Sequence, residues 1–486
     1  MISSRLGIPA LAAIVAAGAA VRLLACRGDL WLDEVWTLAL LDRVHSPLGI
    51  LTEMRHANNH VLNTLFAYAV GPLEHDTLYR APAWLGGVLA IALGARLAWL
   101  GDGPIRSDRR PAADASAGTR AVWAAAVLAG SYLLVLYGSE ARGYSLSLAF
   151  LFAALAVAIT DDVRAASPRA PAYWLASTLA VLSHPLAVHG IVAALSWSAL
   201  RLARRPVGWG ERCRAFLWWH AAPVAAILAF YLGFLRAAHA TLSGPAGTPL
   251  AAWTNAIAMA AGLPAQVPPI GIVVLWAVVL VVGLLWLWRR GSDLWILYAV
   301  ASAGSPAVLA LLERSDLTYE RFFLVAGAFW LLLGARLLAT LWHGGGARRA
   351  AAVLTLMGFL AGNGFRIERL LRDQRGHYED ALRRALADST SDVVTLTSDH
   401  DFRNGLLVAY HAPRVPAGER LRYVRRSDAT TAAPEWLLQH SLTDDHRPPR
   451  MLREFGRRYV FIDHFAATPP SGFHWYLYRR LDRASR

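Results

Sequence analysis

The sequence contains no lysine, so arginine supplies all 48 of its basic residues. Charge of either sign is also scarce, because only 17% of the 486 residues are charged while 56% are hydrophobic. Soluble domains carry about a quarter charged residues, so this composition argues against a soluble protein. The formal net charge of +14 suggests nucleic acid, but the arginines gather in short loops between apolar runs, as membrane proteins arrange them. We therefore expect contact with membrane lipids and none with nucleic acid.

Cysteine is equally rare, with only Cys26 and Cys213 in the chain. Two thiols so far apart provide neither a disulfide framework nor the spacing of a metal site. The topology below places them on opposite faces of the membrane, so we expect no bond between them. An alanine-rich chain without lysine is typical of GC-rich bacterial genes, and a bacterial cell membrane is the expected location.

Long apolar runs recur along the chain, and several extend for roughly 20 residues, the length that crosses the hydrocarbon core of a bilayer. A soluble protein with buried helices is the alternative, but such helices seldom run this long or recur this often. The sequence predicts eleven transmembrane helices, over residues 6–25, 79–100, 121–138, 144–160, 172–187, 188–203, 215–235, 270–288, 293–312, 322–341 and 349–364.

Arginine-rich loops give the orientation. The basic segments 101–120 and 201–214 fall on one side of the predicted helices, and the positive-inside rule makes that side cytoplasmic. The N-terminus is then inside and the C-terminus outside. This result depends on 33–44 and 60–73, which we expect to lie at the interface as juxtamembrane helices of the first outer loop. If 60–73 spanned the membrane, every later loop would change sides.

The composition changes near residue 366, where charge density rises and long apolar runs end. Strand-like segments at 392–397 and 458–463 alternate with a helical pattern at 378–387. The sequence therefore predicts an α-helical polytopic membrane domain over 1–365 and a soluble extracytoplasmic α/β domain over 366–486.

Three short motifs carry polar groups at the predicted outer ends of helices. The first is Trp31-Leu-Asp33-Glu34-Val-Trp36, the second is His56-Ala-Asn58-Asn59-His60-Val-Leu-Asn63, and the third is Tyr137-Gly-Ser139-Glu140-Ala-Arg142-Gly-Tyr144. Charged groups at membrane depth are costly and are often functional. Structural alternatives remain open for each motif: Asp33 as a helix cap, the Asn/His cluster as a cap, and Glu140 with Arg142 as a salt bridge.

The predicted topology collects these groups on the outer side of the membrane. Paired arginine hydrogen bonds suit a phosphate, and a carboxylate can take a proton from an acceptor hydroxyl. The pattern therefore favours a reaction on an anionic lipid headgroup. The residues on this side are Asp33, Glu34, Asn59, His60, Arg80, Glu140, Arg142, Tyr144, His184 and Arg321.

These residues resemble the motifs of the GT-C class of membrane glycosyltransferases, and in particular the bacterial members similar to dolichyl-phosphate-mannose protein mannosyltransferases and aminoarabinose transferases. The resemblance covers residues 1–340. It rests on the order and spacing of five matching segments, which are Leu32-Asp33-Glu34, Asn59-His60, Arg80 with Gly86-Gly87, Ser139-Glu140-Ala141-Arg142 with Tyr144, and Glu320-Arg321-Phe322.

The resemblance implies that a sugar is transferred from a polyprenyl-phosphate-linked donor to an acceptor on the outer face. Asp33 matches the catalytic base of the family, with Glu34 beside it, and Glu140 matches its second acidic site. Arg142 and Arg321, and also Arg80, match the phosphate side. The family's His-Pro-Pro pattern is absent, because His60-Val61-Leu62 stands there, so donor and metal contacts in this segment do not carry over.

Two other classes of function remain possible from the sequence. A transporter or flippase of a lipid-linked intermediate would place charged or broken helices at the midplane and have repeat symmetry, and neither is clear here. A non-catalytic subunit of a cell-envelope glycan assembly complex would bind the donor without turnover. The sequence leaves the sugar and the acceptor open, as protein, lipid or glycan. It establishes no cofactor, although His60 with Asp33, Glu34 or Glu140 offers ligands for a divalent metal.

Overall fold

The computed structural model describes residues 3–73, 75–100, 115–239, 247–264, 266–312 and 318–481. The predicted arginine loop 101–120 therefore lies outside the described residues except for 115–120. The chain forms two compact units. The helical unit comprises Met1–Leu24, Ser46–Gly71 and Tyr79–Ile367, and the sheet unit comprises Ala25–His45, Pro72–Leu78 and Glu368–Arg486.

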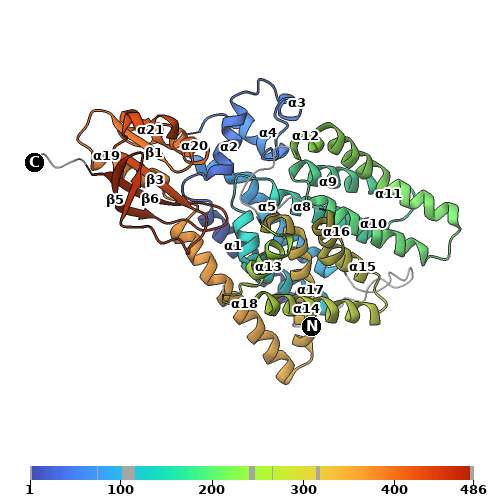
Figure 1. Ribbon diagram of the computed structural model, residues 1–486. Coiled ribbons are helices and arrows are strands. Elements are labelled where there is room, and N and C mark those ends of the chain that lie inside the picture. Colours follow the sequence, from blue (N-terminus) through green and yellow to red (C-terminus); the bar gives the residue numbers. More distant parts are fainter. Residues whose placement is uncertain are drawn as a thin grey trace, which may run out of the picture. The chain divides into compact units, whose positions relative to one another are not determined.

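The helical unit is built from α-helices with short connections (Figure 1). Its first helices are α1 (Ser3–Ala25), α3 (Gly49–Thr52), α4 (Val61–Val70), α5 (Ala81–Trp99), α6 (Ala115–Gly130), α7 (Tyr132–Tyr137), α8 (Tyr144–Asp161), α9 (Ala170–Ser183) and α10 (Ala187–Ala203). They are followed by α11 (Trp209–Phe230), α12 (Arg236–His239), α13 (Pro249–Ala261), α14 (Pro269–Arg289), α15 (Leu294–Ala299), α16 (Ser305–Leu312), α17 (Leu324–His343) and α18 (Gly346–Asp373). Four shorter turns are η1 (Asp76–Arg80), η2 (Tyr231–Leu235), η3 (Val300–Gly304) and η4 (Glu320–Phe323).

The chain is a polytopic membrane protein. Within the described residues, seven helical segments are long and apolar enough to cross a bilayer: Gly7–Ala25, Asp76–Trp99, Tyr144–Asp161, Trp209–Ala238, Pro269–Arg289, Glu320–His343 and Gly346–Ala387. Each of them contains or overlaps a predicted span. The other four predicted spans are also helical, but they are shorter or interrupted. The predicted 172–187 and 188–203 become α9 and α10, of 14 and 17 residues, and 293–312 is divided by η3.

The predicted span 121–138 is broken at Ser131, between α6 and α7. The Tyr132 N–H donates to Asn363 Oδ1 at 2.7 Å, and the Ser131 hydroxyl donates to the Ala260 carbonyl at 3.1 Å. These contacts provide hydrogen-bond partners for the Tyr132 N–H and the Ser131 hydroxyl at the break between α6 and α7. Ala260 belongs to α13, a largely buried helix that was not among the predicted spans, because it is short and contains Thr254 and Asn255.

Segment 60–73 forms α4, which has only ten residues and ends at Gly71, a glycine with φ of +66°. At about 1.5 Å of rise per residue, such a helix extends about 15 Å, which is half of a hydrocarbon core of about 30 Å. A single helix of this length does not cross a bilayer. The interfacial placement of this segment, on which the predicted orientation depends, stays a prediction, and a helix of ten residues is compatible with it.

Two glycines of α5 allow close packing. Gly86 lies against the backbone of α8, and Gly87 leaves room for Arg22, a buried arginine of α1. A Cβ on Gly86 would lie 2.5 Å from the Leu146 backbone nitrogen, and one on Gly87 would lie 2.8 Å from Cδ of Arg22. The Arg22 guanidinium donates to the carbonyls of Leu128 and Ala129 at 3.0 and 3.2 Å. The charge thus lies against carbonyl oxygens at the end of α6, an arrangement that satisfies a buried arginine inside a helix bundle.

Part of the predicted basic loop 201–214 is neutralised by acidic residues. Arg201 contacts Asp162 at 2.7 Å and Asp293 at 3.0 Å, Arg205 contacts Asp162 at 2.8 Å, and Arg204 pairs with Asp293. These pairs join the ends of α8 and α10 to the start of α15. Orientation rules count arginines and lysines and give acidic residues little weight, so the pairing leaves the predicted side unchanged.

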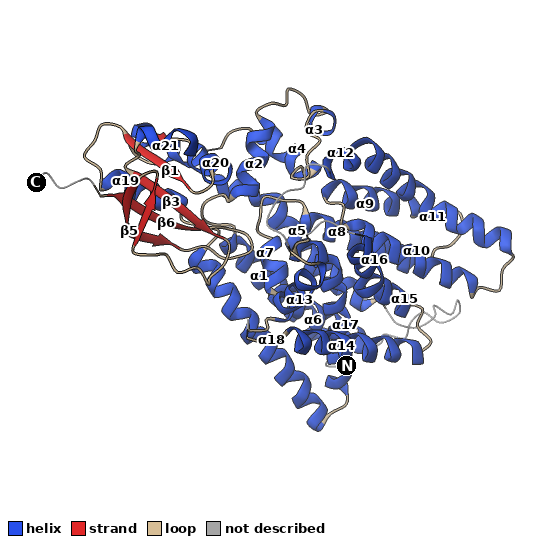
Figure 2. Cartoon of the chain, viewed as in Figure 1, coloured by secondary structure: helices blue, strands red, loops and turns tan. Residues whose placement is uncertain are grey.

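The sheet unit contains all the strands of the described residues (Figure 2). One mixed sheet has the order β2-β1-β3-β6-β5-β4, in which β1 is parallel to β2 and β3 and the remaining neighbours are antiparallel. The strands are β1 (Val394–Ser398), β2 (Leu421–Tyr423), β3 (Trp436–Ser441), β4 (Met451–Glu454), β5 (Arg457–Phe465) and β6 (His474–Arg480). The helices are α2 (Leu32–Leu41), α19 (Tyr378–Ala387), α20 (Asp401–His411) and α21 (Arg426–Ala432), with short turns η5 (Ala412–Arg414) and η6 (Gly418–Arg420).

The predicted α/β domain is confirmed, since β1, β5 and α19 match the predicted segments. The sheet unit also contains α2, the predicted juxtamembrane helix at 33–44. Trp36 of α2 packs edge-on against Phe402 of α20 with ring centroids 4.8 Å apart. The functions assigned to 1–365 and 366–486 stay predictions. The two cysteines, Cys26 and Cys213, form no disulfide within the described part of the chain.

Candidate active site

Arg142 is the centre of a buried polar cluster in the helical unit. It lies in the turn between α7 and α8 and is only 3% exposed. Its guanidinium hydrogen-bonds to Asn58 Oδ1, approaches His60 Nε2 at 2.9 Å and donates to the Tyr144 hydroxyl at 3.4 Å. Segments far apart in the sequence therefore meet at one cation, as the predicted site requires.

Two hydrogen-bond donors approach the ring of His60, one at each nitrogen. The Gly143 N–H donates to His60 Nδ1 at 2.8 Å, while Arg142 approaches Nε2 and has only donors to offer. Burial, followed by the charges of Arg142, His184 and Arg321, holds the pKa of His60 well below its usual range. His60 is therefore neutral near pH 7, and a neutral imidazole accepts through only one nitrogen. The ring accepts from Gly143 or from Arg142 in any one tautomer.

An aromatic group surrounds this cation. The rings of His60 and His184 lie 4.6 Å apart, Tyr144 and His184 also 4.6 Å, and His60 and Tyr144 5.0 Å. Gly143 is required by this packing, since a Cβ there would lie 1.9 Å from the Ser183 carbonyl oxygen and 3.3 Å from Cβ of His60. The glycine of the third motif thus lets the turn before α8 approach the end of α9 and the loop before α4.

Glu140 and Arg321 belong to the same neighbourhood. Glu140 is completely buried, and it interacts electrostatically with Tyr137 together with Glu320 and Arg321. The Arg321 guanidinium lies over the Tyr319 ring, 4.3 Å from its centroid, and its charge acts on His60. The helical unit therefore brings together Glu140, Arg142, Tyr144, His60, His184 and Arg321, all predicted from the sequence.

The neighbouring asparagines have different tasks. The Asn59 side chain donates to the carbonyls of Ile50 and Met54 at 2.7 and 2.9 Å, so it closes the turn before α4. Asn58, which was not among the predicted site residues, is the one that contacts Arg142. Nothing in the sequence separates two adjacent asparagines. The predicted Arg80 is fully buried at the start of α5.

Asp33 and Glu34 lie in the first turn of α2, in the sheet unit. Glu34 is 1% exposed and its Oε2 accepts the Trp31 N–H at 3.1 Å, so this carboxylate caps the helix. Asp33 is partly exposed, and its carbonyl accepts from the Thr37 hydroxyl at 3.0 Å. Helix capping, the structural alternative for this motif, is therefore seen for the Glu34 carboxylate. The catalytic roles of Asp33 and Glu34 stay predictions.

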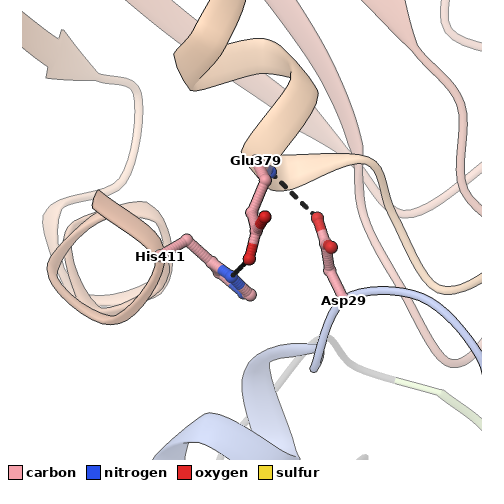
Figure 3. A group of neighbouring side chains, drawn as sticks. All are labelled: Asp29, Glu379 and His411. Atoms are coloured by element: carbon pink, nitrogen blue, oxygen red, sulfur yellow. Dashed lines mark hydrogen bonds and ion pairs between the residues drawn. The ribbon is translucent and has the colours of Figure 1, made fainter. Parts of the chain in front are cut away.

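Metal-ligating side chains gather elsewhere than the sequence suggested. In the described residues, one group combines three such side chains: Asp29, Glu379 and His411, whose ligand atoms lie within 4.8 Å of one another (Figure 3). All three belong to the sheet unit. The group could not be predicted from the sequence, because Asp29 stands 350 positions before Glu379 and the three residues share no motif.

The bundle of apolar helices and the mixed-sheet unit define a polytopic membrane protein with the GT-C fold that its motifs resemble. The structure of ArnT from Cupriavidus metallidurans in the apo state aligns with a TM-score of 0.50 and 12% identity, over 96% of this chain and 97% of that one. ArnT of the same organism bound to undecaprenyl phosphate aligns with a TM-score of 0.49 and 13% identity, over 98% of each chain.

The Archaeoglobus fulgidus oligosaccharyltransferase in complex with Zn and sulfate is a more distant match, with a TM-score of 0.44 and 12% identity over 88% of this chain and 67% of that one. No protein-family model matches the chain, and no curated protein matches it. At such low identity the likeness to ArnT is a likeness of fold.

Proposed function

We propose that this protein is a glycosyltransferase that moves a sugar from a polyprenyl-phosphate-linked donor to an acceptor on the outer face of a bacterial cell membrane. The observation that carries the proposal is Arg142, a buried cation held by Asn58 and Tyr144 within a membrane protein of GT-C fold. A planar guanidinium that is fixed in place is suited to a phosphate, because it offers paired N–H donors.

The proposed chemistry is a single displacement with inversion. Asp33 takes the proton of the acceptor hydroxyl or amine as that atom bonds to the anomeric carbon of the sugar. The bond from the anomeric carbon to the phosphate oxygen breaks, and polyprenyl phosphate leaves with the electron pair. Arg142 and Arg321, and also Arg80, stabilise the charge that develops on this leaving group. Glu34 and Glu140 are the further acidic residues assigned to the reaction.

His60 supports the assignment of Arg142 to the phosphate. Its pKa lies well below the usual range, so it adds no positive charge near pH 7. A neutral imidazole beside a guanidinium does not compete with it for an anion. Asn59, Tyr144 and His184 are the remaining residues proposed to shape the donor site, through packing and turn geometry.

The outer-face location rests on the orientation argument. The short α4 supports an interfacial first loop, and the arginine-rich segments then lie in the cytoplasm with the sheet unit outside. A cysteine-labelling experiment tests this placement in intact cells. An engineered cysteine at the exposed Val393 is expected to react with a membrane-impermeant maleimide, whereas the exposed Trp209→Cys variant is expected to react only after lysis. The reverse pattern would contradict the orientation.

The transfer itself is tested with purified full-length protein, a polyprenyl-phosphate sugar and a panel of protein, lipid and glycan acceptors, by measuring carrier release. Asp33→Asn and Glu140→Gln are expected to lower release by at least about 100-fold, in the range seen when an acid, base or charge-stabilising group is removed. If both variants turn over as the wild type does, the site assignment is wrong. Donor binding without turnover by the wild type would instead favour the non-catalytic subunit.

A further inference from the structure

Three metal-ligating side chains meet in the sheet unit. Asp29 lies in the loop before α2, Glu379 in the first turn of α19, and His411 is the last residue of α20. Figure 3 shows the three side chains as neighbours, with the His411 imidazole against the Glu379 carboxylate and the Asp29 carboxylate against the Glu379 backbone N–H. The Glu379 N–H donates to Asp29 Oδ2 at 2.9 Å, which fixes the loop to the start of α19.

The orientation of His411 is the informative feature. The side chain is completely buried, and Nε2 lies 3.0 Å from the Leu30 carbonyl oxygen, so Nε2 carries the proton and donates it. Nδ1 has no hydrogen-bond partner and lies 3.5 Å from Glu379 Oε1. In the neutral ring, the Nδ1 lone pair therefore faces a carboxylate, and this contact is unfavourable unless a cation or a second proton lies between them.

A histidine that donates one ring N–H to a carbonyl while its other nitrogen faces carboxylates has the arrangement of a metal ligand. The outer hydrogen bond fixes the tautomer and the direction of the free lone pair. The two carboxylates also favour a cation. Their ligand oxygens lie within 4.8 Å of each other, and a bound cation would offset the repulsion between the two negative charges.

We propose that Asp29, Glu379 and His411 bind a divalent cation, with Zn²⁺ as the best match. One imidazole and two carboxylates form a set that zinc accepts, whereas magnesium and calcium favour oxygen ligands alone. Zinc bonds to nitrogen and oxygen of about 2.0–2.2 Å place two ligands on one ion at most about 4.4 Å apart. The ligand atoms lie within 4.8 Å of one another, so small side-chain rotations close them around the ion, and water completes the coordination.

Such an ion would join three separate segments of the sheet unit. Asp29 stands four positions before Asp33, in the segment that leads into α2. Glu379 and His411 belong to α19 and α20, which pack together and against the sheet. The cation would therefore fix the start of α2 to the body of this unit. This inference concerns binding and stability, and it does not depend on the proposed transfer reaction.

The alternative occupant is a proton. In that case His411 is an imidazolium paired with Glu379, a contact that holds the pKa of Glu379 below its usual range, and Asp29 serves only as a helix cap. The two arrangements differ in an observable way. A metal site takes up about one equivalent of ion and is stabilised by it through mass action, whereas the ion pair takes up none.

The test uses tag-free, full-length protein in detergent, stripped with EDTA and then equilibrated with ZnCl₂. Elemental analysis measures the bound zinc, and thermal unfolding measures its effect. The wild type is expected to retain one equivalent and to gain several degrees in Tm. Asp29→Asn and Glu379→Gln are expected to lose both effects, because each exchanges a carboxylate for an amide of the same shape. Asp380→Asn removes a neighbouring, exposed carboxylate on α19 and serves as the matched control.

The proposal is overturned if stripped wild-type protein takes up no zinc, or if the two variants bind as much as Asp380→Asn does. X-ray absorption of the zinc-loaded wild type provides a second measurement that needs no variant. A first shell of one nitrogen with oxygens at about 2.0–2.2 Å supports the site, and a shell with sulfur or with several imidazoles contradicts it.

Discussion

Nε2 of His60 lies 2.9 Å from the guanidinium of Arg142, although 82 positions separate the two residues in the chain. The contact joins the loop before α4 to the turn between α7 and α8, and it places an imidazole that is neutral near pH 7 against a buried cation. Two of the three polar motifs therefore form one site in the helical unit.

Replacing Arg142 by lysine is expected to lower carrier release by at least about tenfold, because an ammonium cannot reproduce a bidentate, planar contact. The guanidinium reaches Asn58, His60 and Tyr144 at once, and a single nitrogen cannot. The control is Arg372→Lys, which changes an arginine that is 61% exposed and paired with Glu368. Equal rates for the two variants would remove Arg142 from the site.

The two nitrogens of His60 can be tested separately. In His60→Asn the side-chain oxygen replaces Nδ1 and keeps the bond from the Gly143 N–H, whereas in His60→Gln the longer side chain replaces Nε2 and faces Arg142. If Gly143 fixes the tautomer, the asparagine variant is expected to be more stable by about 1 kcal/mol, the usual net contribution of a hydrogen bond. Thermal unfolding in detergent measures the difference. A glutamine variant more stable than the asparagine variant would indicate the opposite tautomer, in which Nε2 accepts from Arg142.

Gly143→Ala is expected to destabilise the protein by about 1–3 kcal/mol, the range for overpacking a filled interior. The added methyl would lie 1.9 Å from the Ser183 carbonyl oxygen, a backbone atom that cannot turn aside. Gly208→Ala is the control, because nothing lies within 4 Å of a Cβ there. Equal Tm values for the two variants would contradict the close approach of Gly143 to the end of α9.

The sheet unit is expected to lose stability in mild acid. Burial lowers the pKa of His464 and of His474, so the unfolded chain binds protons more readily between each lowered pKa and about 6.5. Stability from these residues is complete above about pH 6.5 and is lost as the pH falls below it. Tm should decline between pH 7 and 5.5, and the decline should be smaller in His474→Gln. A Tm that does not change over this range would contradict the assignment.

The helices and the sheet unit were predictable because their signals are local. A run of about 20 apolar residues indicates a transmembrane helix by itself. The strand that begins at Val394 and the helix that begins at Tyr378 are indicated by patterns among residues adjacent in the sequence. The break at Ser131 was not predictable, because its partners Asn363 and Ala260 come from distant helices. The placement of α4 at the interface required weighing length against charge, and it stays a prediction.

Some residues of the candidate site were predictable because their signals are also local in the sequence. His60 and Arg142 belong to segments that already contained unusual polar groups at helix ends. Asn58 could not be distinguished from Asn59, since the choice depends on which side chain the turn before α4 directs inward. His411 gave no signal at all, because its carboxylate neighbour Asp29 stands 382 positions earlier and the pair exists only in the folded sheet unit.

The central claim is that the chain breaks the bond between a sugar and a polyprenyl phosphate. The most direct measurement is mass-spectrometric detection of polyprenyl phosphate released from a polyprenyl-phosphate sugar by purified wild-type protein, beside Arg142→Ala and the control Arg372→Lys. Acceptor-dependent release is expected from the wild type and the control, with at least about 100-fold less from Arg142→Ala. Release by Arg142→Ala at the wild-type rate, or no release by the wild type with any acceptor of the panel, would contradict it.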